Sequence, residues 1–194
     1  MQPPSEHVHW MFATGFLLLG LFLLAEAIVG EEVWRRRSWR VYLWPSFLFG
    51  MGVLMWPVMT FYTTSTIHMV AHGAWAQTMM FAGAAELGLA RGKLHSKLWR
   101  LALPFAVIVS GGALLLHERN PWFFQRSSFL HHLLGWTVLA FAVFPLARVL
   151  RPRSSVAHAG FAVLVVAVSV MLYCDRDLAP VFGHLSPLAG EARR

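Results

Sequence analysis

Hydrophobic residues along this chain form six long runs, which are separated by short polar stretches. The runs cover approximately residues 8–30, 41–62, 66–90, 101–118, 129–148 and 155–173. Each run is close to the length, roughly 20 residues, that an α-helix needs to cross the hydrocarbon core of a bilayer. The pattern therefore predicts an all-α fold, a polytopic bundle of six transmembrane helices that makes up a single transmembrane domain and ends in a tail over 174–194.

Composition strengthens the membrane interpretation. Of the 194 residues, 57% are hydrophobic and only 13% are charged, which is too apolar for an ordinary soluble domain of this size. We expect the lipid bilayer to be the main partner, and a homo-oligomer or a larger membrane complex is left open. The net charge of +7 would suit nucleic-acid binding in a soluble protein. Here the basic residues lie in clusters between apolar runs, so we expect no nucleic-acid partner.

The basic clusters predict an orientation. Residues 35–40, 91–100 and 148–153 hold eleven lysines and arginines, and the rest of the chain holds five. Because cytoplasmic loops carry an excess of Lys and Arg, these three segments are expected in the cytoplasm. The prediction is an integral protein of a bacterial inner membrane or a plasma membrane, with both termini extracytoplasmic.

Histidines are distributed unevenly in this topology. Only His95 and His158 fall on the cytoplasmic side. The other eight fall at or near the outer side: His7, His9, His68, His72, His117, His131, His132 and His184.

A transition-metal site is the chemistry that this cluster favours. His68 and His72 are four residues apart, so both lie on one face of the predicted helix. The neighbouring helices end or begin at His117, His131 and His132. Imidazole suits copper, zinc and iron, and Cys174, the single cysteine, excludes a CxxC motif. We predict that His68, His72, His117 and either His131 or His132 bind copper or zinc, with iron also compatible; the alternative is a set of interfacial histidines that bond to one another.

Other residues at the outer side are candidates for additional ligands or for groups that orient the ligands. Met55 and Met59 follow Met51 at intervals of four residues, and thioethers select Cu(I), although methionine is also a common core filler. The full set of additional candidates is His7, His9, Glu118, His184, Met55 and Met59.

Two acidic residues, Glu26 and Glu86, fall inside predicted helices near the cytoplasmic side. Glu86 is 14 positions beyond His72, roughly 21 Å along a helix, so it cannot share a metal ion with that histidine. A carboxylate facing lipid is costly, so we expect Glu86 to point into the bundle. The pair either takes part in a proton or cation step or is neutral or ion-paired for structural reasons.

Three blocks of the sequence resemble the transmembrane-protein-45 family, over approximately 8–140. They are HVHWMFATGFLLLGLF, HGAWAQTMMFAGAAEL and LLLHERNPWFFQRSSFLHHLLGW. The resemblance implies a multi-helix bundle, with seven helices, and a shared histidine site. The positions that match the family pattern are His9, Gly15, His72, Glu86, His117, His131 and His132. The HHLLGW segment is also similar to the cytochrome b561 class.

Several functions are compatible with these features. The first is a histidine-rich copper or zinc site on the extracytoplasmic side, for metal binding, transfer or a metal-dependent redox step. The alternatives are a b-type electron-transfer protein carrying haem b, a non-haem metal oxidoreductase, and a structural subunit of a larger membrane complex. Whether the chain is an enzyme is left open.

Overall fold

The structure is a computed structural model that describes residues 5–62, 66–117, 125–152 and 154–174. Within those ranges every regular element is helical, which confirms the all-α prediction. In chain order the elements are α1 (Ser5–Val29), α2 (Glu31–Arg35), η1 (Arg40–Tyr42), α3 (Leu43–Tyr62), α4 (Thr66–Ala90), η2 (Lys97–Leu101), α5 (Ala102–His117), α6 (Gln125–Phe141), α7 (Val143–Leu150) and α8 (Ser155–Tyr173).

Five helical stretches among the described residues are long and apolar enough to cross a membrane. They are His7–Val29, Arg40–Val58, Lys97–Leu116, Phe129–Leu150 and Ser155–Tyr173. The third predicted span, 66–90, has the bounds of α4 but is not among the five, because His72, Gln77 and Glu86 interrupt its apolar sequence. The prediction of six transmembrane helices is thus supported for five of them.

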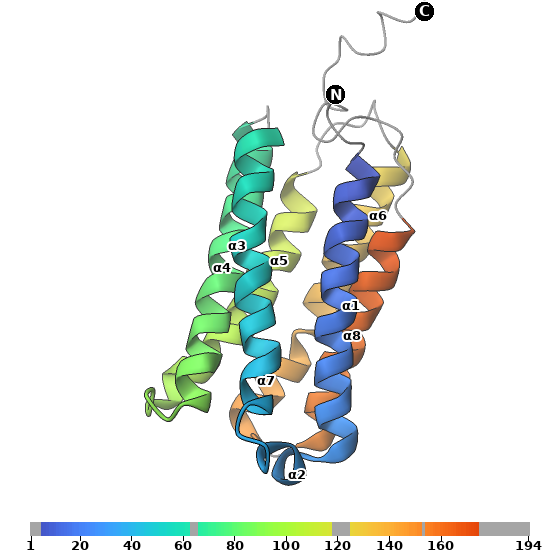
Figure 1. Ribbon diagram of the computed structural model, residues 1–194. Coiled ribbons are helices and arrows are strands. Elements are labelled where there is room, and N and C mark those ends of the chain that lie inside the picture. The colour runs from blue at the N-terminus through green and yellow to red at the C-terminus, as the bar shows by residue number, and fades with distance from the viewer. Residues whose placement is uncertain (1–4, 63–65, 118–124, 153, 175–194) are drawn as a thin grey trace, which may run out of the picture.

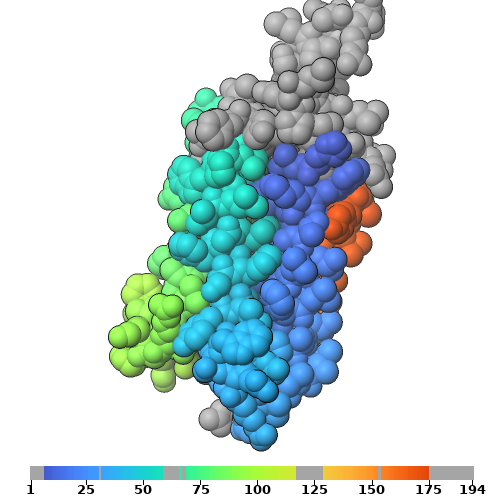
Figure 2. Space-filling view, viewed as in Figure 1, coloured from blue at the N-terminus to red at the C-terminus, as the bar shows by residue number. Residues whose placement is uncertain are grey.

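The long helices stand side by side in one bundle (Figure 1). α1 packs against α8 and α3, while α4 lies between α3 and α5, and α6 contacts α5 and α8. The first residues of α1 and the last residues of α8 lie at the end that is uppermost in Figure 1, and α2 and α7 lie at the lower end. We call these the upper and the lower end. In the space-filling view α1 and α3 form one continuous face (Figure 2).

The α1–α8 pair is antiparallel and is joined by side-chain hydrogen bonds along its length. Near the upper end, Ser169 Oγ donates to the carbonyl oxygen of Ala13 at 2.7 Å. The hydroxyl oxygens of Thr14 and Tyr173 lie 2.7 Å apart. Near the lower end, His158 Nε2 lies 3.1 Å from the carbonyl oxygen of Leu23. These bonds fix the register of the two helices at both ends.

Glycines allow close approach in the other helix pairs. A Cβ at Gly52 would lie 2.7 Å from the carbonyl oxygen of Ala76, and one at Gly83 would lie 2.6 Å from the backbone nitrogen of Phe49. Between α5 and α6, Gly111 and Gly135 face each other's carbonyl oxygens in the same way. Small residues at such positions are typical of helix pairs that pack in lipid.

Two local features shape the lower end. Gly92, with φ of 64°, ends α4 in a Schellman turn, in which the Lys93 N–H bonds to the carbonyl oxygen of Gly88 at 2.8 Å. A one-residue turn at Ala142 separates α6 from α7, although the predicted span 129–148 lies within the single membrane-crossing stretch Phe129–Leu150. The physical reason is Pro145, which has no N–H to donate to the carbonyl of Phe141.

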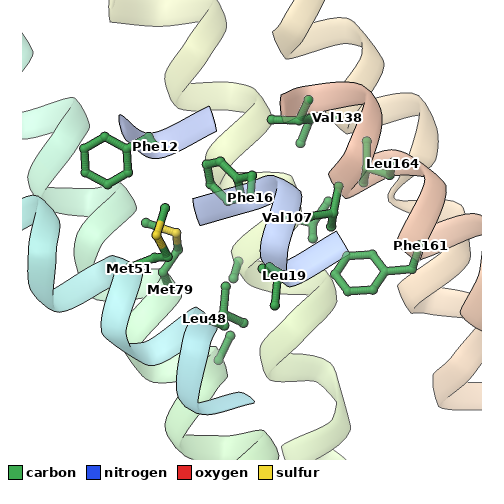
Figure 3. Packing of buried hydrophobic residues seen from close by; sticks show 14 of the residues in the cluster. Phe12, Phe16, Leu19, Leu48, Met51, Met79, Val107, Val138, Phe161 and Leu164 are labelled. Atoms are coloured by element: carbon green, nitrogen blue, oxygen red, sulfur yellow. The ribbon is translucent and has the colours of Figure 1, made fainter. Parts of the chain in front are cut away.

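Apolar side chains fill the centre of the bundle. Figure 3 shows Phe16, Leu48, Val107 and Phe161 from four helices pointing toward one another. Among these side chains is a cavity of about 80 Å³, which is lined almost wholly by apolar groups. The hydroxyl of Ser110, which faces it, donates to the carbonyl oxygen of Ala106 at 2.7 Å.

Candidate functional site

Three histidines from three helices surround one small cavity at the upper end. His9 comes from α1, His72 from α4 and His131 from α6, and together with Met55 of α3 they line a space of about 40 Å³. We call this space the histidine chamber. His72 and His131 are only 8% and 7% exposed, and Met55 is buried as well. Such deep burial is unusual for histidines at a membrane–water interface, and both side chains line the same cavity.

The rings of His9 and His131 are in edge-to-face contact across the chamber. Their ring centroids are 6.0 Å apart and their planes are inclined by 66°. A metal bonded to imidazole nitrogen at about 2.0–2.1 Å lies about 3 Å from each ring centre, so two ligands of one ion have centroids about 5–6 Å apart. Among the residues that the structure describes, no group of three or more His, Cys, Asp or Glu side chains is arranged to hold a metal ion. The described geometry therefore offers a pair of imidazoles, with His72 and a thioether nearby.

An aromatic layer closes the histidine chamber from below. The Trp75 ring stacks on Phe16 at 6.0 Å and on Phe12 at 6.5 Å, and it lies 6.4 Å from the His72 ring. Trp75 also lines the central apolar cavity, and its indole is the aromatic part of the boundary between the two spaces, which Ser110, Leu114 and Leu172 complete. This packing surrounds the imidazoles with apolar material, in which a bound cation would be shielded from water.

The predicted site residues are distributed as follows. His72, His131, His9 and Met55 line the histidine chamber. His132 and His7 are exposed, and the His7 ring lies 5.5 Å from the Trp10 ring. The side chains of His68, His117 and Met59, and all of Glu118 and His184, lie outside the described residues.

The difference between the two adjacent histidines follows from how α6 is rotated in the bundle. His131, Leu134 and Val138 form a buried face, whereas His132 is on the exposed side. The sequence does not distinguish these faces, because Leu133 and Trp136 make the exposed side apolar as well. His9 was predicted only as an additional ligand. It lies near the start of α1, which begins at Ser5, and no local sequence pattern indicates its contacts with other helices.

The acidic residues lie at the lower end, far from the histidine chamber. Glu26 is buried, and its Oε2 is 3.7 Å from Nε2 of His158. These two residues, with Glu86, Arg35 and Arg148, line a cavity of about 110 Å³. His158 thus has both a carboxylate and a backbone carbonyl of α1 beside the same ring nitrogen.

Glu86 lies at the boundary between that cavity and a larger one. The larger cavity has a volume of about 420 Å³ and is lined by Arg35, Arg100 and Arg148 as well as Glu86 and His95; we call it the arginine cavity. These arginines were predicted only to determine topology, and nothing in their spacing indicated that three of them face one cavity.

Comparisons of the chain with protein-family models, with curated proteins and with solved structures find no match. The resemblance to the transmembrane-protein-45 family stays a prediction, and the functional argument rests on the residues themselves.

Proposed function

We propose that the chain is an integral membrane protein in which α4 is a sixth membrane-crossing helix. α4 has 25 residues, a length of about 38 Å at 1.5 Å per residue, which exceeds the roughly 30 Å hydrocarbon core. It lies between α3 and α5, two of the apolar candidates for crossing. Its polar residues His72 and Glu86 face cavities inside the bundle, so they need not meet lipid.

The outer surface of the bundle supports this proposal. Large apolar side chains such as Val70, Phe105, Trp136 and Val163 are exposed on four different helices. A soluble monomer rarely exposes so much continuous apolar surface. By the positive-inside rule, the lower end with its basic segments faces the cytoplasm and the histidine chamber faces the other side.

The function we propose is binding of a copper ion in the histidine chamber, for metal acquisition, delivery or a redox step. The observation that carries it is the 6.0 Å separation of the His9 and His131 rings within a buried chamber that also includes Met55. Imidazole binds both copper and zinc, but a thioether favours Cu(I). Zinc sites in proteins are almost always four-coordinate with His, Cys or carboxylate ligands, a set that is less well matched here.

Haem b is less well supported as the occupant. Two facing imidazoles are chemically suitable as axial ligands. A porphyrin ring, however, is many times larger than the chamber of about 40 Å³, and Trp75, Phe12 and Phe16 are stacked directly beneath it. Accommodating the macrocycle would require this aromatic layer to separate.

The test is copper binding by untagged full-length protein, measured by elemental analysis and by competition with a Cu(I) chelator. We expect His131→Ala to weaken Cu(I) binding by about ten-fold or more, because one of few ligands is lost. The matched control is His132→Ala, which removes the adjacent exposed imidazole and should leave binding unchanged. Met55→Leu should weaken Cu(I) binding but not zinc binding.

Three results would contradict the proposal. They are the absence of copper binding in the unaltered protein, equal losses in the two histidine variants, and a Soret absorbance band in the purified protein. The last of these would establish haem as the occupant.

A further inference from the structure

The arginine cavity combines features that the proposed copper site does not explain. Its three arginines come from three separate elements: Arg35 ends α2, Arg100 belongs to η2 and Arg148 belongs to α7. Glu86 is the carboxylate that shares this space, so three guanidinium groups against one carboxylate leave two positive charges. Topology alone requires basic residues near this end, but it does not require three of them to line one cavity.

Arg148 shows that the cavity is more than a collection of solvated charges. Its guanidinium lies over the Trp44 ring, with Cζ 5.6 Å from the ring centroid. Its Nη1 is buried and has no hydrogen-bond acceptor among the residues that the structure describes. This nitrogen is too deeply buried to meet a molecule in the cavity. Arg148 as a whole is only partly buried and lines the cavity, so an anion there would accept hydrogen bonds from its other N–H groups.

We propose that the arginine cavity binds a phosphate group. Guanidinium groups form paired N–H···O bonds with phosphate oxygens, and the Trp44 ring holds the Arg148 fork in a fixed orientation. The volume of about 420 Å³ lies within the range of small-ligand pockets, about 300–1000 Å³. Glu86, which faces the same space, opposes the anion and weakens its binding.

Two sources can supply this chemistry, a phosphate in solution and the headgroup of an anionic lipid. The experiment uses full-length protein in nanodiscs of phosphatidylcholine and measures binding of inorganic phosphate by calorimetry. A second arm measures, by native mass spectrometry, whether phosphatidylglycerol is retained from a mixture with phosphatidylcholine. Binding in the first arm identifies a soluble anion, and retention in the second arm alone identifies a lipid headgroup.

Substitutions test whether either probe binds in the arginine cavity. Arg148→Gln should weaken phosphate binding by about ten-fold or more, because a charge-assisted hydrogen bond is lost. Arg151→Gln is the matched control, since Arg151 is exposed at the end of the same helix and does not line the cavity; it should change binding less than two-fold. Glu86→Gln should tighten binding, a gain that misfolding cannot produce.

The proposal is overturned if the unaltered protein binds neither probe. It is also overturned if Arg148→Gln and Arg151→Gln weaken binding equally, or if Glu86→Gln fails to tighten it. Copper binding at the upper end is independent of all these outcomes.

Discussion

The histidine chamber has a volume of about 40 Å³, whereas the arginine cavity at the opposite end has about 420 Å³. The small chamber is formed by residues inside long helices and is closed by stacked aromatic rings. The large cavity is formed by residues at helix ends and in short elements. Long packed helices can hold ligands around a single ion, while helix ends can surround a polyatomic group and leave it an entrance.

The largest expected difference between the two ends is their accessibility to a thiol reagent added outside the cell. Cys174, the single cysteine, is exposed at the end of α8, and Ser38 is exposed at the lower end. In intact cells a membrane-impermeant maleimide should label Cys174 completely. Ser38→Cys, in a Cys174→Ser background, should be labelled only after lysis. Labelling of both positions from outside would mean that an even number of segments crosses the membrane between Ser38 and Cys174, instead of the predicted five. Reversed labelling would mean an inverted orientation.

Removing the aromatic partition should have the next largest effect. Trp75→Ala deletes the ring that stacks on Phe12 and Phe16, and we expect a loss of about 3–5 kcal/mol in unfolding free energy. Denaturation in detergent, followed by circular dichroism, measures it. Trp136→Ala, at a position 63% exposed on α6, is the matched control and should cost much less. Similar losses in both variants would show that Trp75 is not a packing element of the chamber.

Lowering the pH should change the ligand affinities of the two sites differently, and this is the smallest of the expected effects. A protonated imidazole cannot bind a metal, so copper affinity should fall by at least about ten-fold between about pH 7 and about pH 5. Guanidinium groups remain charged over this range. Sulfate, a dianion throughout, should therefore bind the arginine cavity no more weakly at about pH 5 than at about pH 7, since protonation of His95 or Glu86 in its lining only makes the cavity more positive. Chelator competition and calorimetry at each pH measure the two affinities, and parallel changes at both sites would contradict the assigned ligands.

Much of the fold follows from local sequence patterns. The predicted ranges 66–90 and 155–173 have the bounds of α4 and α8, because runs of apolar residues between basic clusters mark helix ends. The break at Ala142 was missed although Pro145 lies inside the predicted helix. Proline is tolerated in membrane helices, so its presence alone does not decide between a kink and a break.

The sites were less predictable, because they depend on contacts between helices. The histidines were predicted to gather at one side, but His9 lines the chamber while His132 does not, a difference set by helix rotation. For Arg35 and Arg148 the positive-inside rule already gave a sufficient reason for their presence, and no local pattern remained to indicate the cavity that they share.

α1 extends without a break from the histidine chamber to the cavity of about 110 Å³ that Glu26 lines. It carries His9 and Glu26, which are 17 positions apart and thus separated by roughly 25 Å along the axis. Hydrogen bonds to α8 at Ala13 and Leu23 hold it near both ends. A shift of this rod along its axis would move His9 and Glu26 by the same amount. The histidine chamber and the cavity around Glu26, chemically unrelated, therefore share one rigid helix.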